Sequence, residues 1–168
     1  MRLFFALWPD GEVVRRLQAA ANLFALEGAG RWVPASNLHL TLAFIGEVSD
    51  EKFAVLQQIG QSIRACRFTV VCDCLEYWPQ PRAVVAAVRD PPEALLDLSA
   101  RLHEIIELPQ MPLRAHVTLA RKVAQAPVLP AMSPIVWRAT EFSLIRSQTG
   151  GAASAYTVLG TWPLLYES

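Results

Sequence analysis

The sequence is poor in charged residues and has no long apolar run. Charged side chains make up 18% of its 168 residues, the formal net charge is zero, and the charges are spread without acidic or basic blocks. Binding a long nucleic-acid duplex requires many phosphates to be neutralised at once, so duplexes are poor candidate partners, whereas a nucleic-acid end needs only a few cations. No run approaches the roughly 18 apolar residues that span a membrane. The apolar start before Asp10 is too short for a signal peptide.

Cysteines are also few. Cys66, Cys72 and Cys74 are odd in number and clustered, which is not the pattern of a disulfide framework. Cys72 and Cys74 alternate along an apolar run, which favours buried free thiols over a metal site. We therefore expect a soluble, cytoplasmic protein that holds no metal and no cofactor. No heptad run calls for a partner helix, so we also expect a monomer.

The length and the periodicity of apolar residues predict one domain, residues 1–168, of the α+β class. Expected helices begin at Pro9-Asp10, at Ser49 and at Pro91-Pro92, the last with Leu95, Leu98, Leu102 and Ile105 facing inward. Expected strands cover 2–8, 38–46, 68–78, 82–88, 114–121, 137–147 and 155–164, with hairpin turns at 79–81 and at Gly150-Gly151. Hairpins make the sheets mostly antiparallel, and we expect two pseudo-symmetric halves with helices outside and a central cleft between them.

One short motif occurs twice, as HLTLA at 39–43 and HVTLA at 116–120. In a strand, side chains alternate between faces, so His39 and Thr41 point one way and the leucines point the other. His116 and Thr118 are placed in the same manner. Four identities in five positions arise by chance at a rate on the order of one in a thousand in a chain this short. Two related halves would bring both imidazoles and both hydroxyls around one point.

The residue types in this quartet favour acid–base chemistry. Zinc sites take three or four ligands at short spacings, and threonine is not an ordinary ligand. A serine or cysteine triad needs a nucleophile and an orienting acid, and neither motif supplies them. Two histidines can act on a phosphodiester as a general base toward water and a general acid toward the leaving oxygen. The threonine hydroxyls can donate hydrogen bonds to the non-bridging phosphate oxygens.

These motifs resemble those of the two-histidine phosphoesterases. With RLFFAL at the start, NLHLTLAFIGEV at 37–48, HVTLAR at 116–121 and EFSLIRS at 141–147, the chain is similar over its whole length to the RNA 2′,3′-cyclic phosphodiesterases, also called 2′-5′ RNA ligases, of the LigT-like group. The resemblance implies a bilobal α+β fold and hydrolysis of RNA or nucleotide 2′,3′-cyclic phosphates to 2′-phosphomonoesters without metal.

By matching position, the resemblance implies that His39 is the proton donor, His116 the proton acceptor, and Thr41 and Thr118 the phosphate-binding residues. The near identity of the two motifs leaves the order of acid and base open in the sequence itself, and the roles must exchange if the reaction runs in reverse as a weak 2′-5′ ligation.

Three further residues are candidates for substrate binding. Phe44 and Arg121 each follow a motif histidine by five positions, and a base can stack between an aromatic ring and a guanidinium. Strict alternation puts this position on the wrong face, so each strand has to end or bend, near Gly46 and Lys122. Arg82, after the turn at 79–81, is the third candidate.

Other residues are given structural interpretations. His103 is expected to be solvated. Trp8, Trp78 and Trp137 could offer stacking platforms, but tryptophan in a strand is more often a core residue, which is the interpretation favoured here. The Gly150-Gly151 turn, with Arg146 and Ser147, could contact the tail of a substrate.

Two alternatives to the RNA cyclic phosphodiesterase remain open. The quartet could bind RNA or nucleotide phosphate ends without catalysis, although arginine or lysine would serve phosphate binding better. The chain could also be a phosphoesterase for another small cyclic phosphate or for a 2′-5′ linkage.

Overall fold

The computed structural model describes residues 1–148 and 154–167 of the chain. Its elements, in chain order, are β1 (Arg2–Leu7), α1 (Gly11–Ala21), β2 (Arg31–Trp32), the 3-10 turn η1 (Ala35–Asn37), β3 (Leu40–Glu47), α2 (Asp50–Ser62), β4 (Cys66–Cys72), β5 (Cys74–Trp78), β6 (Ala83–Ala87), α3 (Glu93–Ile106), β7 (His116–Arg121), β8 (Ile135–Ala139), β9 (Glu141–Gln148), β10 (Ala155–Pro163) and β11 (Tyr166–Glu167).

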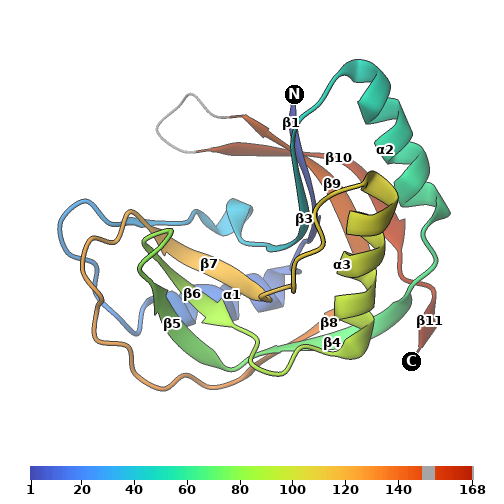
Figure 1. Ribbon diagram of the computed structural model, residues 1–168. Coiled ribbons are helices and arrows are strands. Elements are labelled where there is room, and N and C mark those ends of the chain that lie inside the picture. The colour runs from blue at the N-terminus through green and yellow to red at the C-terminus, as the bar shows by residue number, and fades with distance from the viewer. Residues whose placement is uncertain (149–153, 168) are drawn as a thin grey trace.

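The strands form three sheets (Figure 1). Two of them have four strands, in the orders β10-β9-β1-β3 and β2-β7-β6-β5, and each contains one of the two motif strands, β3 or β7. The third has the order β11-β4-β8. Paired strands are antiparallel except for β11 on β4. The expected α+β class with mostly antiparallel sheets is therefore confirmed.

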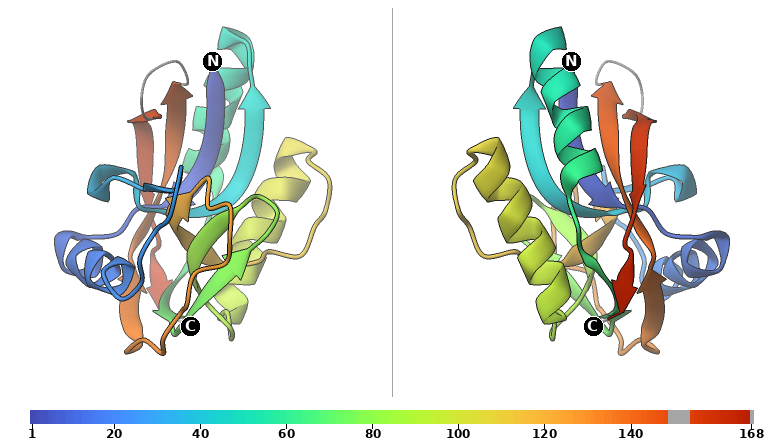
Figure 2. Two further views of the ribbon diagram at one scale, coloured as in Figure 1. Left: turned by 90° about the vertical axis from the view of Figure 1, so that its left-hand side faces the viewer. Right: turned by 90° about the vertical axis from the view of Figure 1, so that its right-hand side faces the viewer.

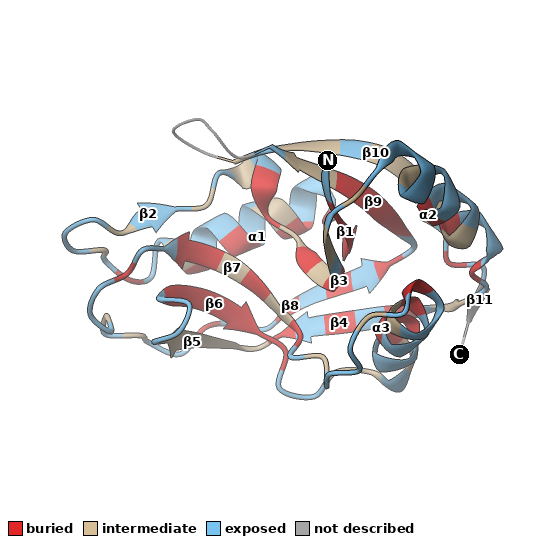
Figure 3. Ribbon diagram, turned by 45° about the horizontal axis from the view of Figure 1, so that its top comes forward, coloured by how far each residue is buried: buried red, intermediate tan, exposed pale blue. Residues whose placement is uncertain are grey.

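The helices cover the sheets from outside (Figure 2). Helix α1 packs against β7 and β8, α2 against β9 and β10, and α3 against β3 and β4. The side chains of Asp10 and Ser49 accept hydrogen bonds from the backbone N–H three residues on, which caps α1 and α2 as the sequence predicts. Buried residues lie along the inner strands (Figure 3) and form one main core shared by both four-stranded sheets.

Two segments predicted as single strands are each divided between two sheets. Residues 68–78 break at Asp73, so that β4 and β5 belong to different sheets, and residues 137–147 break at Thr140 between β8 and β9. The Asp73 carboxylate accepts a hydrogen bond from Arg89 Nε at 3.0 Å at this break. Cys72 and Cys74 continue the apolar alternation across Asp73, which conceals the first break. At the second break, two exposed polar residues in succession, Thr140 and Glu141, interrupt the alternation between Ala139 and Phe142.

The inner face of α3 and the turn before β10 differ in how far the structure tests them. Ile105 was expected to face inward but is 45% exposed, and Ile106 is buried in its place, because the buried positions of α3 advance by four residues after Leu102. The Gly150-Gly151 turn lies outside the described residues, although β9 and β10, the strands it was predicted to join, do pair in antiparallel fashion.

None of the helices within residues 1–148 and 154–167 has the length and apolar character needed to cross a membrane.

A close contact between α2 and β10 supplies a test of the packing. A Cβ added at Gly60 would lie 2.5 Å from Trp162 Cη2, a side chain that also contacts the rings of Phe5 and Phe142. Alanine is favoured over glycine in a helix by about 1 kcal/mol, but overpacking costs about 1–3 kcal/mol. We therefore expect Gly60→Ala to lower the urea midpoint of unfolding. Gly11→Ala, where the nearest atom lies 3.8 Å away, is the control and should not lower it.

Candidate active site

The two motifs occupy equivalent places in the two four-stranded sheets. His39 immediately precedes β3, His116 begins β7, and these two strands pack against each other where the sheets meet (Figure 1). In both motifs the histidine and the threonine are partly buried, while the residues between and after them are fully buried. The predicted alternation of polar and apolar faces is confirmed for both copies.

The Leu-Ala that ends each motif forms a β-bulge. In β3, Thr41 lies opposite Ala6 and Ala43 opposite Phe5, so Leu42 is an extra residue in the strand. In β7, Thr118 lies opposite Val85 and Ala120 opposite Val84, so Leu119 is the extra residue. Leu and Ala of each pair are both buried on the core side, which resets the alternation. The residue that follows is thereby returned to the face of the histidine.

This bulge explains how Phe44 and Arg121 come to lie on the same side as the histidines. The sequence predicted a bend near Gly46 and Lys122, and both residues do have positive φ, 86° and 57°. The change of face, however, occurs earlier, at Leu42–Ala43 and Leu119–Ala120. Gly46 and Lys122 therefore are not the residues that turn Phe44 and Arg121 inward.

A cavity of about 340 Å³ lies on this face of the β1–β3 sheet. It contains four of the residues chosen from the sequence, His39, Thr41, Phe44 and Arg121. Its other lining residues are Arg2, Phe4, Ser147, Ser154 and Tyr156. Of these, the sequence pointed only to Ser147 as a possible substrate contact. The described lining thus combines two guanidinium groups, several hydroxyls and aromatic rings, and contains no carboxylate.

Aromatic rings enclose the His39 imidazole. Trp8 stacks on it with a centroid separation of 5.3 Å and an interplanar angle of 4°, Phe4 lies at 4.9 Å, and Tyr156 meets it edge-on at 5.3 Å. Nδ1 of His39 lies 2.6 Å from the backbone carbonyl oxygen of Asn37. The Asn37 side chain donates in turn to the Ser154 carbonyl at 2.7 Å, which ties the turn before β3 to the start of β10.

His116 has the same arrangement with different neighbours. Its Nδ1 lies 2.6 Å from the carbonyl oxygen of Arg114, again two residues before the histidine, and the Trp78 ring lies 4.3 Å away. The Arg114 guanidinium lies over the same indole, 3.9 Å from the Trp78 centroid. Glu76 accepts hydrogen bonds from Trp78 Nε1 at 2.7 Å and from Arg114 at 3.2 Å. One carboxylate therefore fixes both groups that surround His116.

The hydrogen bonds to the carbonyls determine which nitrogen is available for chemistry. A carbonyl oxygen only accepts, so Nδ1 carries the proton in both histidines, and Nε2 is left as the reactive nitrogen. Burial lowers the pKa of His39 to about 4, and the charges of Arg121 and His116 act in the same direction. Burial also lowers the pKa of His116, with the nearby charges of Arg114 and Arg121 adding to the effect. In the unliganded protein both imidazoles are therefore neutral at pH 7.

The remaining sequence candidates divide into those near the histidines and those far from them. Trp8 and Trp78 were expected in the core but flank the two histidines, and only Trp137 of the three is buried. Ser147 lines the cavity, whereas strand alternation turns Arg146 to the opposite face of β9. Arg82 is exposed and is not among the residues lining this cavity.

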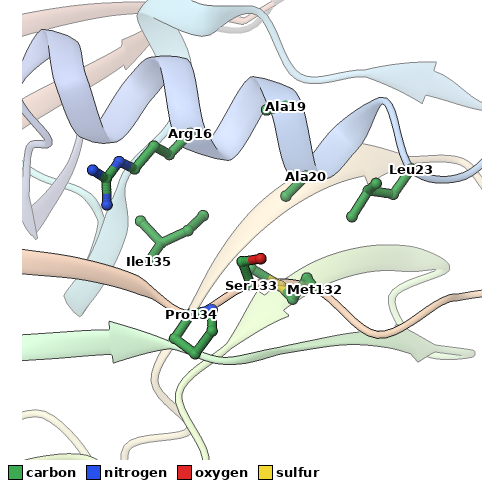
Figure 4. Close-up of a pocket in the computed structure, with 8 residues that line it drawn as sticks. All are labelled: Arg16, Ala19, Ala20, Leu23, Met132, Ser133, Pro134 and Ile135. Atoms are coloured by element: carbon green, nitrogen blue, oxygen red, sulfur yellow. The ribbon is translucent and has the colours of Figure 1, made fainter.

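His103 was expected to be solvated, but it is partly buried and its Nδ1 lies 2.8 Å from the Ser99 carbonyl oxygen one turn earlier in α3. It belongs to neither motif strand. A separate cavity of about 330 Å³ between α1 and residues 132–135 (Figure 4) is lined largely by apolar atoms of Ala19, Ala20, Leu23 and Met132, and it contains neither motif histidine.

The cavity brings His39, Thr41 and Arg121 together. His116 and Thr118 are not among its lining residues but lie on β7, which packs against β3, and the charge of His116 lowers the pKa of His39. Imidazoles with available Nε2 atoms, hydroxyls and a guanidinium suit phosphoryl chemistry. The family model described as LigT like Phosphoesterase matches residues 7–86. The RNA 2′,3′-cyclic phosphodiesterase of Escherichia coli (strain K12) is 36% identical over 171 residues, covering 97% of this chain and 96% of that protein. The enzyme of the same name from Thermus thermophilus is 30% identical, covering 99% and 92%.

The fold agrees with these relatives. The crystal structure of E. coli LigT complexed with 3′-AMP superposes with a TM-score of 0.88 at 35% identity, covering 97% of each chain. The chain therefore belongs to the LigT-like phosphoesterase family, the class of two-histidine phosphoesterases that its motifs resemble.

The lowered pKa values give a prediction for the free and anion-bound protein. We expect the pKa of His39, followed by NMR, to lie near 4 in the free protein. Sulfate stays dianionic across this range, and a bound dianion favours the imidazolium, so sulfate should raise the pKa of both motif histidines. Binding then takes up protons, and sulfate affinity should increase as the pH falls from 7 toward 5. The resonances of His103 are the internal control, and a site that bound sulfate without moving His39 or His116 would contradict this electrostatic description.

Proposed function

We propose that this protein hydrolyses the 2′,3′-cyclic phosphate of RNA or of nucleotides to a 2′-phosphomonoester by metal-independent general acid–base catalysis. The observation that carries the proposal is the duplicated motif, in which a carbonyl holds Nδ1 of each histidine and leaves both Nε2 atoms available. Two relatives over nearly the full chain are RNA 2′,3′-cyclic phosphodiesterases. The reverse reaction, 2′-5′ ligation, would be a weak secondary activity.

In the proposed mechanism, His116 is the proton acceptor and His39 the proton donor. Nε2 of neutral His116 takes a proton from water as the water oxygen bonds to phosphorus. The bond between phosphorus and O3′ breaks, and Nε2–H of His39 gives its proton to O3′. Because burial lowers the pKa of His39, its proton has to be acquired with the substrate, whose negative charge favours the imidazolium.

The hydroxyls of Thr41 and Thr118 are proposed to donate hydrogen bonds to the non-bridging phosphate oxygens. Arg121 would contact the same oxygens or the base, since it is exposed, lines the cavity and lowers the pKa of both histidines. Phe44 is 50% exposed in the same cavity and offers a ring face to the base. Arg82 is proposed only as an outer contact to the substrate, from its place after the turn at 79–81.

The partner in this proposal is the 3′ end of an RNA or a nucleotide that carries a cyclic phosphate. Solved structures of E. coli LigT contain 3′-AMP, ATP or NADP+, which supports a nucleotide-sized ligand. We further propose that residues 1–168 act as one bilobal domain, as a monomer, in the cytoplasm.

Removal of either motif histidine tests the proposal directly. We expect His39→Ala and His116→Ala each to lower kcat by roughly 100-fold or more, the scale of a lost general acid or base. The assay is phosphorus NMR of a short RNA with a 2′,3′-cyclic end, using protein treated with EDTA. His103→Ala is the matched control and should retain wild-type turnover. Tight binding of the cyclic end without any product in the wild-type protein would favour the non-catalytic binder instead.

A substrate with sulfur at the 3′ bridging position separates the two histidine roles. A thiolate leaves without protonation far more readily than an alkoxide, because thiols have pKa values near 8.5. If His39 is the acid, the 3′-thio substrate should restore His39→Ala to within roughly tenfold of the wild-type rate, whereas His116→Ala should remain roughly 100-fold slower. Rescue of His116→Ala alone would reverse the assignment.

A further inference from the structure

Arg2 lines the same cavity as His39 and Phe44 and has no role in the proposed hydrolysis. We propose that Arg2 binds the phosphate on the 5′ side of the terminal nucleotide, so that the preferred substrate is the cyclic-phosphate end of an RNA chain rather than a free nucleoside cyclic phosphate. This inference rests on the proposed hydrolysis at the same site.

The first support is the position of Arg2 along β1. Phe4 contacts the His39 ring at 4.9 Å, and Arg2 lies two residues from Phe4 on the same strand face, about 7 Å further from the histidines. The start of β1 is at the end of its sheet remote from β7 (Figure 1). Arg2 and Arg121 thus both line one cavity of about 340 Å³.

The second support is the orientation of the Arg2 guanidinium. Its Cζ atom lies 4.9 Å from the centroid of the Phe44 ring, a cation–π contact between two residues that line the cavity, and Arg2 as a residue is exposed. A planar guanidinium with free donors suits two oxygens of a phosphate.

The third support is the absence of a competing anion at the head group. The ion pairs among the described residues include neither Arg2 nor Arg121. Glu47 lies opposite Arg2 in the β1–β3 pair, but its carboxylate is 3.4 Å from the amino group of Met1. The net charge of the chain is zero, yet this cavity contains two guanidinium groups and its described lining contains no carboxylate.

The test compares three substrates that share the same terminal cyclic phosphate. These are adenosine 2′,3′-cyclic phosphate, the dinucleotide ApA 2′,3′-cyclic phosphate, and the same dinucleotide with a neutral methylphosphonate linkage. We expect the wild-type kcat/KM to be roughly tenfold higher for the charged dinucleotide than for the methylphosphonate, the scale of one charge-assisted hydrogen bond. In Arg2→Gln this ratio should fall to about one, because the loss of kcat/KM on the charged dinucleotide should exceed the loss on adenosine 2′,3′-cyclic phosphate.

The matched control is Arg15→Gln, because Arg15 is an exposed arginine of α1 that pairs with Glu12. This variant should keep the wild-type ratio. Arg2→Lys, which retains charge but not the planar fork, should keep part of it. A wild-type ratio near one, or an equal loss on all three substrates in Arg2→Gln, would overturn the inference and leave Arg2 as a support for Phe44. Failure of the wild-type protein to hydrolyse any of the three would instead overturn the proposed function.

Discussion

The site requires three positions of each motif strand to lie on one face, namely the histidine, the threonine and the fifth residue after the histidine, and regular strand alternation does not allow this. A regular strand can present the histidine and the threonine of each motif together, but it sends the fifth position after the histidine into the core. The extra residue at Leu42 and at Leu119 resolves this conflict, because two consecutive apolar side chains are buried on the same side. The Leu-Ala of each motif is thus as necessary to the geometry as the histidine, and this explains why five residues are repeated and not three.

Burial of the imidazoles has a cost that the local structure offsets. Desolvation disfavours the charged form of both histidines, and the backbone carbonyls of Asn37 and Arg114 act in the opposite direction on each pKa. Those carbonyls also fix the tautomer, so that a neutral imidazole presents a lone pair at Nε2. Burial and the charge of Arg121 favour the neutral form of both imidazoles in the free protein. In the proposed mechanism, protonation of His39 would therefore be coupled to the binding of an anionic substrate.

The sequence was sufficient for the class of fold, the caps of α1 and α2, and the placement of each histidine and threonine on one face of its strand, because these depend on local patterns. The sheet assignments of β4 and β5 could not be read from the sequence, since Cys72 and Cys74 continue the alternation across Asp73. The break between β8 and β9 left a signal in the two successive polar residues Thr140 and Glu141, but such a signal does not indicate that the chain passes to another sheet. Trp8 and Trp78 were misplaced because composition cannot distinguish a core ring from one packed on an imidazole. The only sign of the bulges in the sequence is the repeated Leu-Ala. The carbonyls that bind Nδ1 of each histidine could not be predicted, since every residue has a backbone carbonyl.

The two halves are alike at the imidazoles and differ in what supports them. On the His39 side, the residue two before the histidine is anchored by a neutral hydrogen bond from Asn37 to the Ser154 carbonyl. On the His116 side the corresponding residue, Arg114, is anchored by an ion pair to Glu76, which also binds Trp78. The backbone around the two histidines is thus approximately symmetric, but the electrostatic surroundings of the two imidazoles differ. Two chemically identical groups can take opposite roles in one reaction only if their surroundings differ. The unlike supports, and a cavity that is lined by His39 but not by His116, provide such a difference for the proposed reaction.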